Sequence, residues 1–160
     1  MSLLKSIQDG EGKTVEFKVE LPNSNTLAKT IIAFSNTGGG KLIIGVNDQG
    51  EIIGLEPDVN IFELKDKVAS IIYETCYPTV LPDIYTTTID DQLLLIIEVY
   101  RGNLLPYYLK NKGKNEGVYI RVGATNRKAS HENILELERQ RMNISFDQEA
   151  NREVELDSLD

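Results

Sequence analysis

Hydrophobic and charged positions alternate along residues 14–20, which is the two-residue period of a half-buried β-strand. This alternation places Glu16 and Lys18 on one face of the strand and Phe17 on the other. Other segments repeat their apolar positions every three or four residues and predict helices with one buried side. These segments are residues 25–36, 61–75 and 131–141.

Further apolar segments have the length and composition of strands. They are residues 41–46, 51–54, 84–89, 93–100 and 118–122, with polar loops expected at 101–117 and 123–129. Turn-forming residues at 47–50 and 90–92 join the first four of these strands into two hairpins. We therefore predict an α+β domain with a mixed, largely antiparallel sheet of about six strands and three packed helices. In the third helix, Ile134, Leu135 and Leu137 are expected to face inward.

The length of 160 residues and a hydrophobic content of 41% predict one folded domain, which we place at residues 1–146. Residues 147–160 hold six acidic residues and one arginine, and we expect a disordered tail or a linker to a missing C-terminal region. Cys76 is the single cysteine, no secretory signal is visible, and the apolar runs are too short to span a bilayer. These features predict a cytoplasmic protein that does not enter a membrane.

The formal net charge is −8, which argues against nucleic-acid binding for the chain as a whole. Residues 101–128, however, carry seven lysines and arginines against Glu116 alone. Such a basic stretch suits the phosphates of DNA or RNA, although an ordinary solvated loop has the same composition. The candidate contacts are Lys110, Lys112, Lys114, Arg121, Thr125, Arg127 and Lys128.

Three carboxylates and a lysine form a second candidate site. Glu11 precedes the first strand, Glu16 and Lys18 lie on it, and Asp48 follows the strand at 41–46. Carboxylate oxygens suit Mg²⁺ or Mn²⁺, and a lysine can stabilise charge that develops on a phosphate. The structural alternatives are that Glu11 caps a turn, Glu16 pairs with Lys18, and Asp48 forms the hairpin turn.

A glycine run at residues 38–40, followed by Lys41, invites comparison with a phosphate-binding loop. The nucleotide-binding pattern needs a strand before the glycines and a helix after them, with Ser or Thr after the lysine. Here a helix precedes the glycines, a strand follows, and residue 42 is leucine. We expect the glycines to end the helix and allow close backbone packing, and we do not expect ATP as a cofactor.

Four sequence blocks, taken in order, resemble the Schlafen AlbA-type domain, a DNA-binding domain of bacterial transcriptional regulators. The blocks are Glu11-x4-Glu16-Phe17-Lys18, residues 32–54 with their Gly38-Gly39-Gly40 run, residues 101–108, and residues 118–127 with the helix that follows. The resemblance covers about residues 8–142. It implies an α+β domain that binds nucleic acid and that in bacterial proteins precedes a further C-terminal region.

The same resemblance implies a metal-dependent nuclease as an alternative to a binding module. Some Schlafen domains are metal-dependent RNA nucleases that use two glutamates and one aspartate, and the matching positions are Glu11, Glu16 and Asp48. Such nucleases pair two related lobes around a groove, so one lobe implies a homodimer, for which the hairpin at 84–100 offers an edge. Apart from the resemblance, a third interpretation of the sequence is a dimerisation or protein-interaction domain whose acidic tail docks elsewhere.

Overall fold

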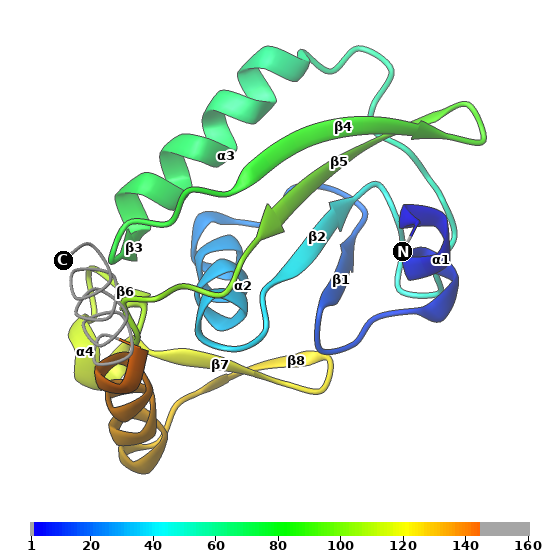
Figure 1. Cartoon of the computed structure of the whole chain (residues 1–160). Helices are drawn as coiled ribbons and strands as arrows, with labels where there is room; N and C mark the ends of the chain where they lie inside the picture. Colours follow the sequence, from blue (N-terminus) through cyan, green and yellow to red (C-terminus); the bar gives the residue numbers. More distant parts are fainter. Residues whose placement is uncertain (1, 145–160) are drawn as a thin grey trace, which may run out of the picture.

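The computed structural model describes residues 2–144, and these residues form a four-stranded sheet with helices on both sides (Figure 1). The strands lie in the order β1 (Val15–Lys18), β2 (Gly40–Ile44), β5 (Gln92–Val99) and β4 (Asp83–Ile89). β1 runs parallel to β2, and the other neighbours are antiparallel. The mixed, largely antiparallel α+β class predicted from the sequence is confirmed.

Two long helices cover one face of the sheet. α2 (Ser24–Asn36) begins where the Asn23 side chain accepts a hydrogen bond from Thr26 N–H, and α3 (Ile61–Thr75) begins at Asn60 in the same way. The apolar sides of both helices pack on the sheet through a large buried cluster that includes Ile31 and Ile72. The predicted bounds of the second helix, residues 61–75, are confirmed.

A short helix, α1 (Leu3–Asp9), lies over the opposite face of the sheet. Its Ile7 packs in a smaller buried cluster with Phe17, Ile43 and Leu94. Because the alternation in β1 sends Phe17 to this side, Glu16 points toward α2 on the other side.

The β4–β5 hairpin is closed by a two-residue turn. Asp90 and Asp91 both have positive φ angles, 52° and 61°, as the turn that fits the twist of a hairpin requires. The turn fixes Ile89 opposite Gln92, and the whole register follows from that pair.

Smaller elements follow the main sheet along the chain. They are β3 (Cys76–Tyr77) paired with β6 (Tyr108–Leu109), α4 (Gly113–Glu116), β7 (Tyr119–Val122) paired with β8 (Thr125–Lys128), and a helix at residues 131–144. Figure 1 shows the β7–β8 hairpin passing below the main sheet toward β1.

The structure corrects four local predictions. The expected strand at 51–54 is reduced to one isolated bridge between Val46 and Ile52. The expected loop at 123–129 contains β8, because its polar residues pair with β7. Short elements occupy part of the expected loop at 101–117, and Leu135 is exposed while Ile134 and Leu137 are buried. The predicted tail at 147–160 lies outside the described residues.

Candidate nucleic-acid interface

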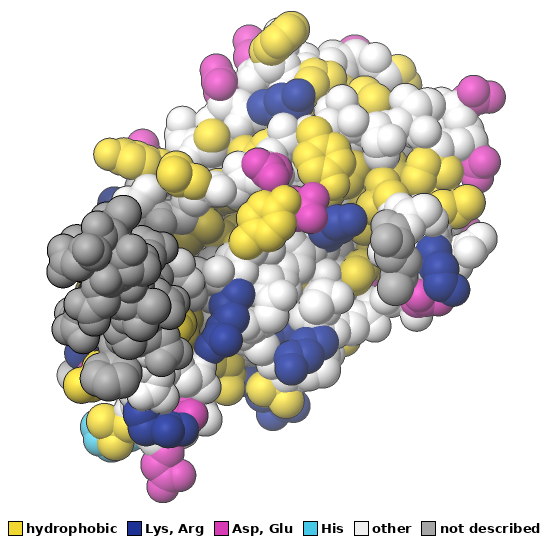
Figure 2. Space-filling view, viewed as in Figure 1, with side chains coloured by type: hydrophobic (Ala, Val, Ile, Leu, Met, Phe, Trp, Pro, Cys, Tyr) yellow, Lys and Arg dark blue, Asp and Glu magenta, His cyan; other side chains and the backbone are white. Residues whose placement is uncertain are grey.

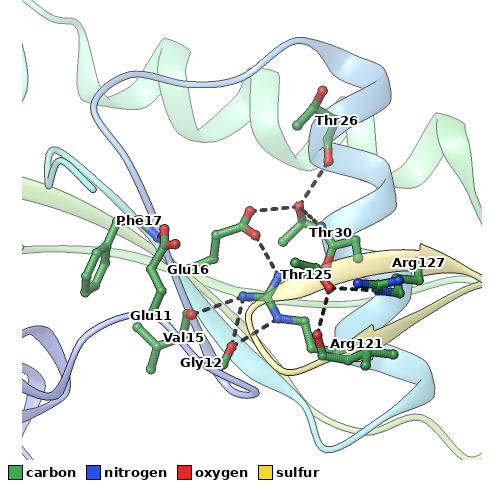
Figure 3. Close-up of polar contacts among 12 residues, drawn as sticks. Glu11, Gly12, Val15, Glu16, Phe17, Thr26, Thr30, Arg121, Thr125 and Arg127 are labelled. Atoms are coloured by element: carbon green, nitrogen blue, oxygen red, sulfur yellow. Dashed lines mark hydrogen bonds and ion pairs between the residues drawn. The ribbon is translucent and has the colours of Figure 1, made fainter. Parts of the chain in front are cut away.

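Arg121 was expected to contact phosphate, but its guanidinium lies in the interior, although the residue is only two positions before the turn of the β7–β8 hairpin. The residue is 3% exposed, and one terminal nitrogen donates to Glu16 Oε1 at 2.6 Å and to Asn126 Oδ1 at 2.8 Å. The remaining N–H groups donate to the carbonyl oxygens of Gly12 and Val15 (Figure 3). All five donors of the side chain therefore have acceptors within the protein. The prediction that Arg121 binds nucleic acid is wrong in this geometry.

Glu16 is also buried, and both of its carboxylate oxygens are hydrogen-bonded within the protein. Its second oxygen, Oε2, lies 3.0 Å from Thr30 Oγ1 on α2, and Asn126 of β8 donates to the same hydroxyl at 2.9 Å. The expected pairing of Glu16 with Lys18 is therefore replaced by a pairing with Arg121. Together these contacts fix the hairpin to β1 and α2, so that Glu16 and Arg121 position the hairpin.

Glu11 occupies the free edge of β1. Its Oε1 accepts a hydrogen bond from Phe17 N–H at 2.9 Å (Figure 3). Because β2 takes up only one side of the strand, the Phe17 N–H points away from the sheet and would otherwise meet water. Glu11 thus satisfies a main-chain donor at the strand edge.

The expected convergence of Glu11, Glu16 and Asp48 is not found. Because β1 and β2 are parallel, Glu11 before β1 and Asp48 after β2 belong to opposite ends of the strand pair. No group of three His, Cys, Asp or Glu side chains within residues 2–144 is placed to hold a metal ion. The residues do not fit the Mg²⁺ or Mn²⁺ site that the family resemblance implied, and we assign no charge-stabilising role to Lys18.

Most of the other predicted basic contacts have partners within the chain. Lys114 pairs with Glu138 at 3.4 Å, Lys128 pairs with Glu116, and Lys110 donates to the main-chain oxygen of Tyr73 at 2.9 Å. These contacts are exposed, so each contributes little to the stability of the fold and leaves the cation within reach of other anions. The two carboxylate pairs offset the charges of Lys114 and Lys128, whereas the partner of Lys110 is a neutral carbonyl.

Thr125 and Arg127 lie on the exposed side of β8. Arg127 Nε donates to Thr125 Oγ1 at 3.3 Å, and neither side chain contacts a carboxylate within the described residues. Lys112 is also exposed and precedes α4. The hairpin and its neighbouring loop thus retain a few cations that are free of acidic partners.

A second group of cations, which sequence reasoning missed, surrounds the exposed glycine Gly38. Lys13, Lys41 and Arg101 line two adjoining pockets of about 350 and 320 Å³, and both pockets include Gly38 and Arg101. None of the three cations lies within 4.0 Å of a carboxylate in the described part of the chain. We call this group the Gly38 cation cluster.

The glycine run brings these cations together. Gly39 has a φ angle of +73°, and a Cβ atom there would lie 2.6 Å from the carbonyl oxygen of Val99 at the end of β5. This close approach places Arg101, two residues beyond Val99, beside the loop. Gly39 N–H also donates to Phe34 O and ends α2, which confirms the helix-stop interpretation of the glycine run.

The surroundings of the Gly38 cation cluster are mixed in charge. Glu136 and Glu98 line the two pockets, but Glu136 is bonded to Arg139, and Glu98 accepts a hydrogen bond from Tyr85 Oη at 3.0 Å. Figure 2 shows Lys and Arg side chains gathered on the lower middle of the visible face, around an area of backbone and uncharged polar side chains. Exposed cations next to accessible backbone are typical of surfaces that contact phosphate.

A comparison with known protein families matches most of the chain. Residues 11–130 match the family model described as Schlafen, AlbA_2. None of the curated proteins matches the chain.

Several solved structures match the chain, and two of them illustrate the shared fold. The first is the DIP2311 protein from Corynebacterium diphtheriae, with 24% identity and a TM-score of 0.53 over 73% of this chain and 22% of that protein. The second is the N-terminal domain of a protein related to the ATP-dependent DNA helicase RecG, from Nitrosomonas europaea. It has 23% identity and a TM-score of 0.56 over 79% of this chain and 90% of that domain. The chain thus spans about a fifth of the first protein and most of the second domain.

Proposed function

The chain belongs to the Schlafen AlbA_2 family, and from this premise we propose that it is a nucleic-acid-binding module. The observation that carries the proposal is the Gly38 cation cluster, in which Lys13, Lys41 and Arg101 have no acidic partners among residues 2–144. A cation that has no acidic partner within the protein is free to neutralise a phosphate and release its counterions, which favours binding. We therefore assign the main phosphate contacts of DNA or RNA to this cluster.

The exposed side of the β7–β8 hairpin is the second part of the proposed surface. A two-stranded ribbon is narrow enough to enter the major groove of DNA, and Thr125, Arg127 and Lys128 are exposed on β8. The buried pair of Glu16 and Arg121 holds this ribbon in place. Arg121 thus acts on binding through the position of the hairpin.

A metal-dependent nuclease is not proposed for the described residues. The three carboxylates that such an enzyme would use are separated by the parallel arrangement of β1 and β2, and two of them already bond Phe17 N–H and Arg121. No helix within residues 2–144 is long and apolar enough to cross a membrane. A cytoplasmic location and a homodimer remain predictions. Two copies would present two cation clusters to one nucleic acid and raise the apparent affinity without new contacts.

The proposal is tested by fluorescence anisotropy with labelled single-stranded DNA, duplex DNA and RNA at several salt concentrations. A triple variant, Lys13→Gln, Lys41→Gln and Arg101→Gln, removes the Gly38 cation cluster. A matched triple variant, Lys110→Gln, Lys112→Gln and Lys114→Gln, removes the same charge from the predicted basic segment. We expect the first variant to bind far more weakly and to lower the slope of log K against log salt by about 2 to 3.

The matched control decides where the interface lies. If the control variant loses binding and the first variant does not, the interface lies on the segment at 110–114 and the Gly38 assignment is wrong. If the parent chain binds none of the three nucleic acids at low salt, the proposed function itself is wrong.

A further inference from the structure

An exposed tyrosine lies at the margin of the Gly38 cation cluster. Tyr100 follows β5 and precedes Arg101, and it lines the pocket of about 320 Å³ together with Lys41. The residue is 61% exposed, which is high for an aromatic side chain. Its Oη donates to Asp83 Oδ2 at 3.0 Å, and this hydrogen bond restrains the ring. In Figure 2, hydrophobic and acidic side chains adjoin the Lys and Arg group in the middle of the visible face.

A second tyrosine is held in the same way on the same side of the sheet. Tyr85 of β4 packs against the buried cluster beneath α1, and its Oη donates to Glu98 Oε1. Glu98 lies directly opposite Lys41 on β2 and directly opposite Asp83 on β4. Side chains at directly paired positions share one face of a sheet, so these three charges form a row. The row is positive on β2 and negative on β5 and β4.

This division of charge suits the two parts of a nucleotide. Lys41 and Arg101 are placed to bind a phosphate, whereas the acidic end of the row repels a second anion and accepts a neutral base. Asp83 and Glu98 each use one oxygen for a tyrosine, and the other oxygen has no hydrogen-bond partner among residues 2–144. Those free oxygens can accept hydrogen bonds from the N–H groups of a base.

We propose that the Gly38 cation cluster binds single-stranded nucleic acid, with an unpaired base stacked on Tyr100 and phosphates at Lys41 and Arg101. This inference rests on the proposed function and adds the class of nucleic acid. In a duplex the faces of the bases are covered by their neighbours, so only an unpaired base can stack on an exposed ring. Stacking on one aromatic side chain raises affinity by about 5- to 100-fold and tolerates any sequence, because every base has a π-face.

The first test is fluorescence anisotropy with a labelled single strand of about 12 nucleotides and with the duplex of the same sequence. Tyr100→Ala removes the ring and no charge. We expect it to weaken binding of the single strand by about 5- to 100-fold and to leave binding of the duplex unchanged. The slope of log K against log salt should equal that of the parent, because every cation is retained.

Two control variants separate the ring of Tyr100 from other changes. Tyr100→Phe keeps the ring and loses the hydrogen bond to Asp83, and we expect it to bind the single strand nearly as well as the parent. Tyr73→Ala removes a ring of similar exposure, 64%, from α3, and Tyr73 lines neither pocket of the cation cluster. We expect this variant to bind like the parent.

The second test is photochemical cross-linking of the parent chain, which does not depend on the folding of a variant. A single strand that carries 5-iododeoxycytidine is irradiated in the complex, and the modified peptide is identified by mass spectrometry. We expect the cross-link at Tyr100, because the reaction joins the halogenated base to an aromatic side chain in contact with it.

Three outcomes would overturn the inference. They are a Tyr100→Ala variant that binds the single strand as tightly as the parent, an equal loss of binding for the single strand and the duplex, and a cross-link at another residue in place of Tyr100. In each of these cases the parent still binds nucleic acid, so the proposed function stands. A parent chain that binds no nucleic acid at low salt would remove both. If Tyr100→Ala fails to fold, the cross-link decides.

Discussion

β1 and β4 are both outer strands of the same sheet, yet side chains occupy the free edge of β1 and none does so at β4 within the described residues. On β1, Glu11 accepts the outward N–H of Phe17, and Arg121 donates to the outward carbonyl of Val15. On β4, the outward groups of Ile84, Thr86 and Thr88 meet no other strand. The first edge is closed within the chain, and the second is available for pairing.

This difference changes the meaning of the Glu11-x4-Glu16 motif. Acidic residues at this spacing resemble metal ligands when the sequence is considered alone. In the structure one of them satisfies a main-chain donor, and the other neutralises a buried arginine that satisfies main-chain acceptors. An acidic motif next to an edge strand therefore has a structural use that requires no metal.

The largest expected effect comes from breaking the buried pair. Arg121→Met leaves Glu16 buried without its counter-charge, and we expect the free energy of unfolding to fall by about 3 to 5 kcal/mol. Arg127→Met, on the exposed side of the same hairpin, should change it by less than about 0.5 kcal/mol. Urea denaturation of both variants measures the contrast. Equal small effects would mean that the hairpin is not held through Arg121.

Removing the hydrogen bond at the β1 edge should have a smaller effect. Glu11→Ala leaves the Phe17 N–H without its acceptor and should lower the free energy of unfolding by about 1 kcal/mol. Glu11→Gln keeps an acceptor oxygen and should remain close to the parent in the same denaturation experiment. If the glutamine variant were as unstable as the alanine variant, the negative charge of Glu11 would matter more than its hydrogen bond.

The elements with strong local signals were predictable from the sequence. The helix at 61–75 has a capping Asn60 and an apolar side, and the hairpin strands β4 and β5 were placed within one residue at each end. β8 was missed because Asn126, Arg127 and Lys128 have no strand-like pattern. Their strand conformation depends on pairing with β7 and on the contact of Asn126 with Thr30.

The candidate site was less predictable because its partners are far apart in the sequence. Sequence reasoning assigned Glu16 to a metal site and Arg121 to a phosphate site, whereas the two residues form one ion pair across 105 positions. The Gly38 cation cluster joins Lys13, Lys41 and Arg101, and no spacing pattern connects them. The glycine run itself was the available signal, since an extended set of glycines indicates a place where other backbone approaches closely.

Alkaline pH should lower the stability of the folded protein through the ionisation of Tyr85 on β4. Burial, together with a hydrogen bond to Glu98, raises the pKa of Tyr85 from 10.0 to about 12. The folded state therefore holds this proton more tightly than the unfolded state, so the contribution to stability is complete below pH 10 and is lost as the pH rises toward 12. Denaturation midpoints across this range should fall more steeply for the parent than for Tyr85→Phe. Identical slopes would contradict this account of Tyr85.

The smallest expected effect is that of a divalent metal. Because Glu11, Glu16 and Asp48 are not brought together, millimolar Mn²⁺ should leave the unfolding temperature unchanged. A site occupied at 100 times its Kd would stabilise the folded state by about 2.7 kcal/mol, which a thermal scan detects easily. If Mn²⁺ raised the unfolding temperature of the parent but not of Glu16→Gln, the protein would hold a metal site that includes Glu16.

The contrast between the two edges is tested most directly by amide hydrogen exchange of Phe17 and Thr86. We expect the Phe17 N–H to be protected, because Glu11 of the same chain accepts its hydrogen bond. We expect the Thr86 N–H to exchange much faster, because it points away from β5 and meets no other strand among residues 2–144. A Thr86 N–H that is protected as well as that of Phe17, or an unprotected Phe17, would contradict the contrast.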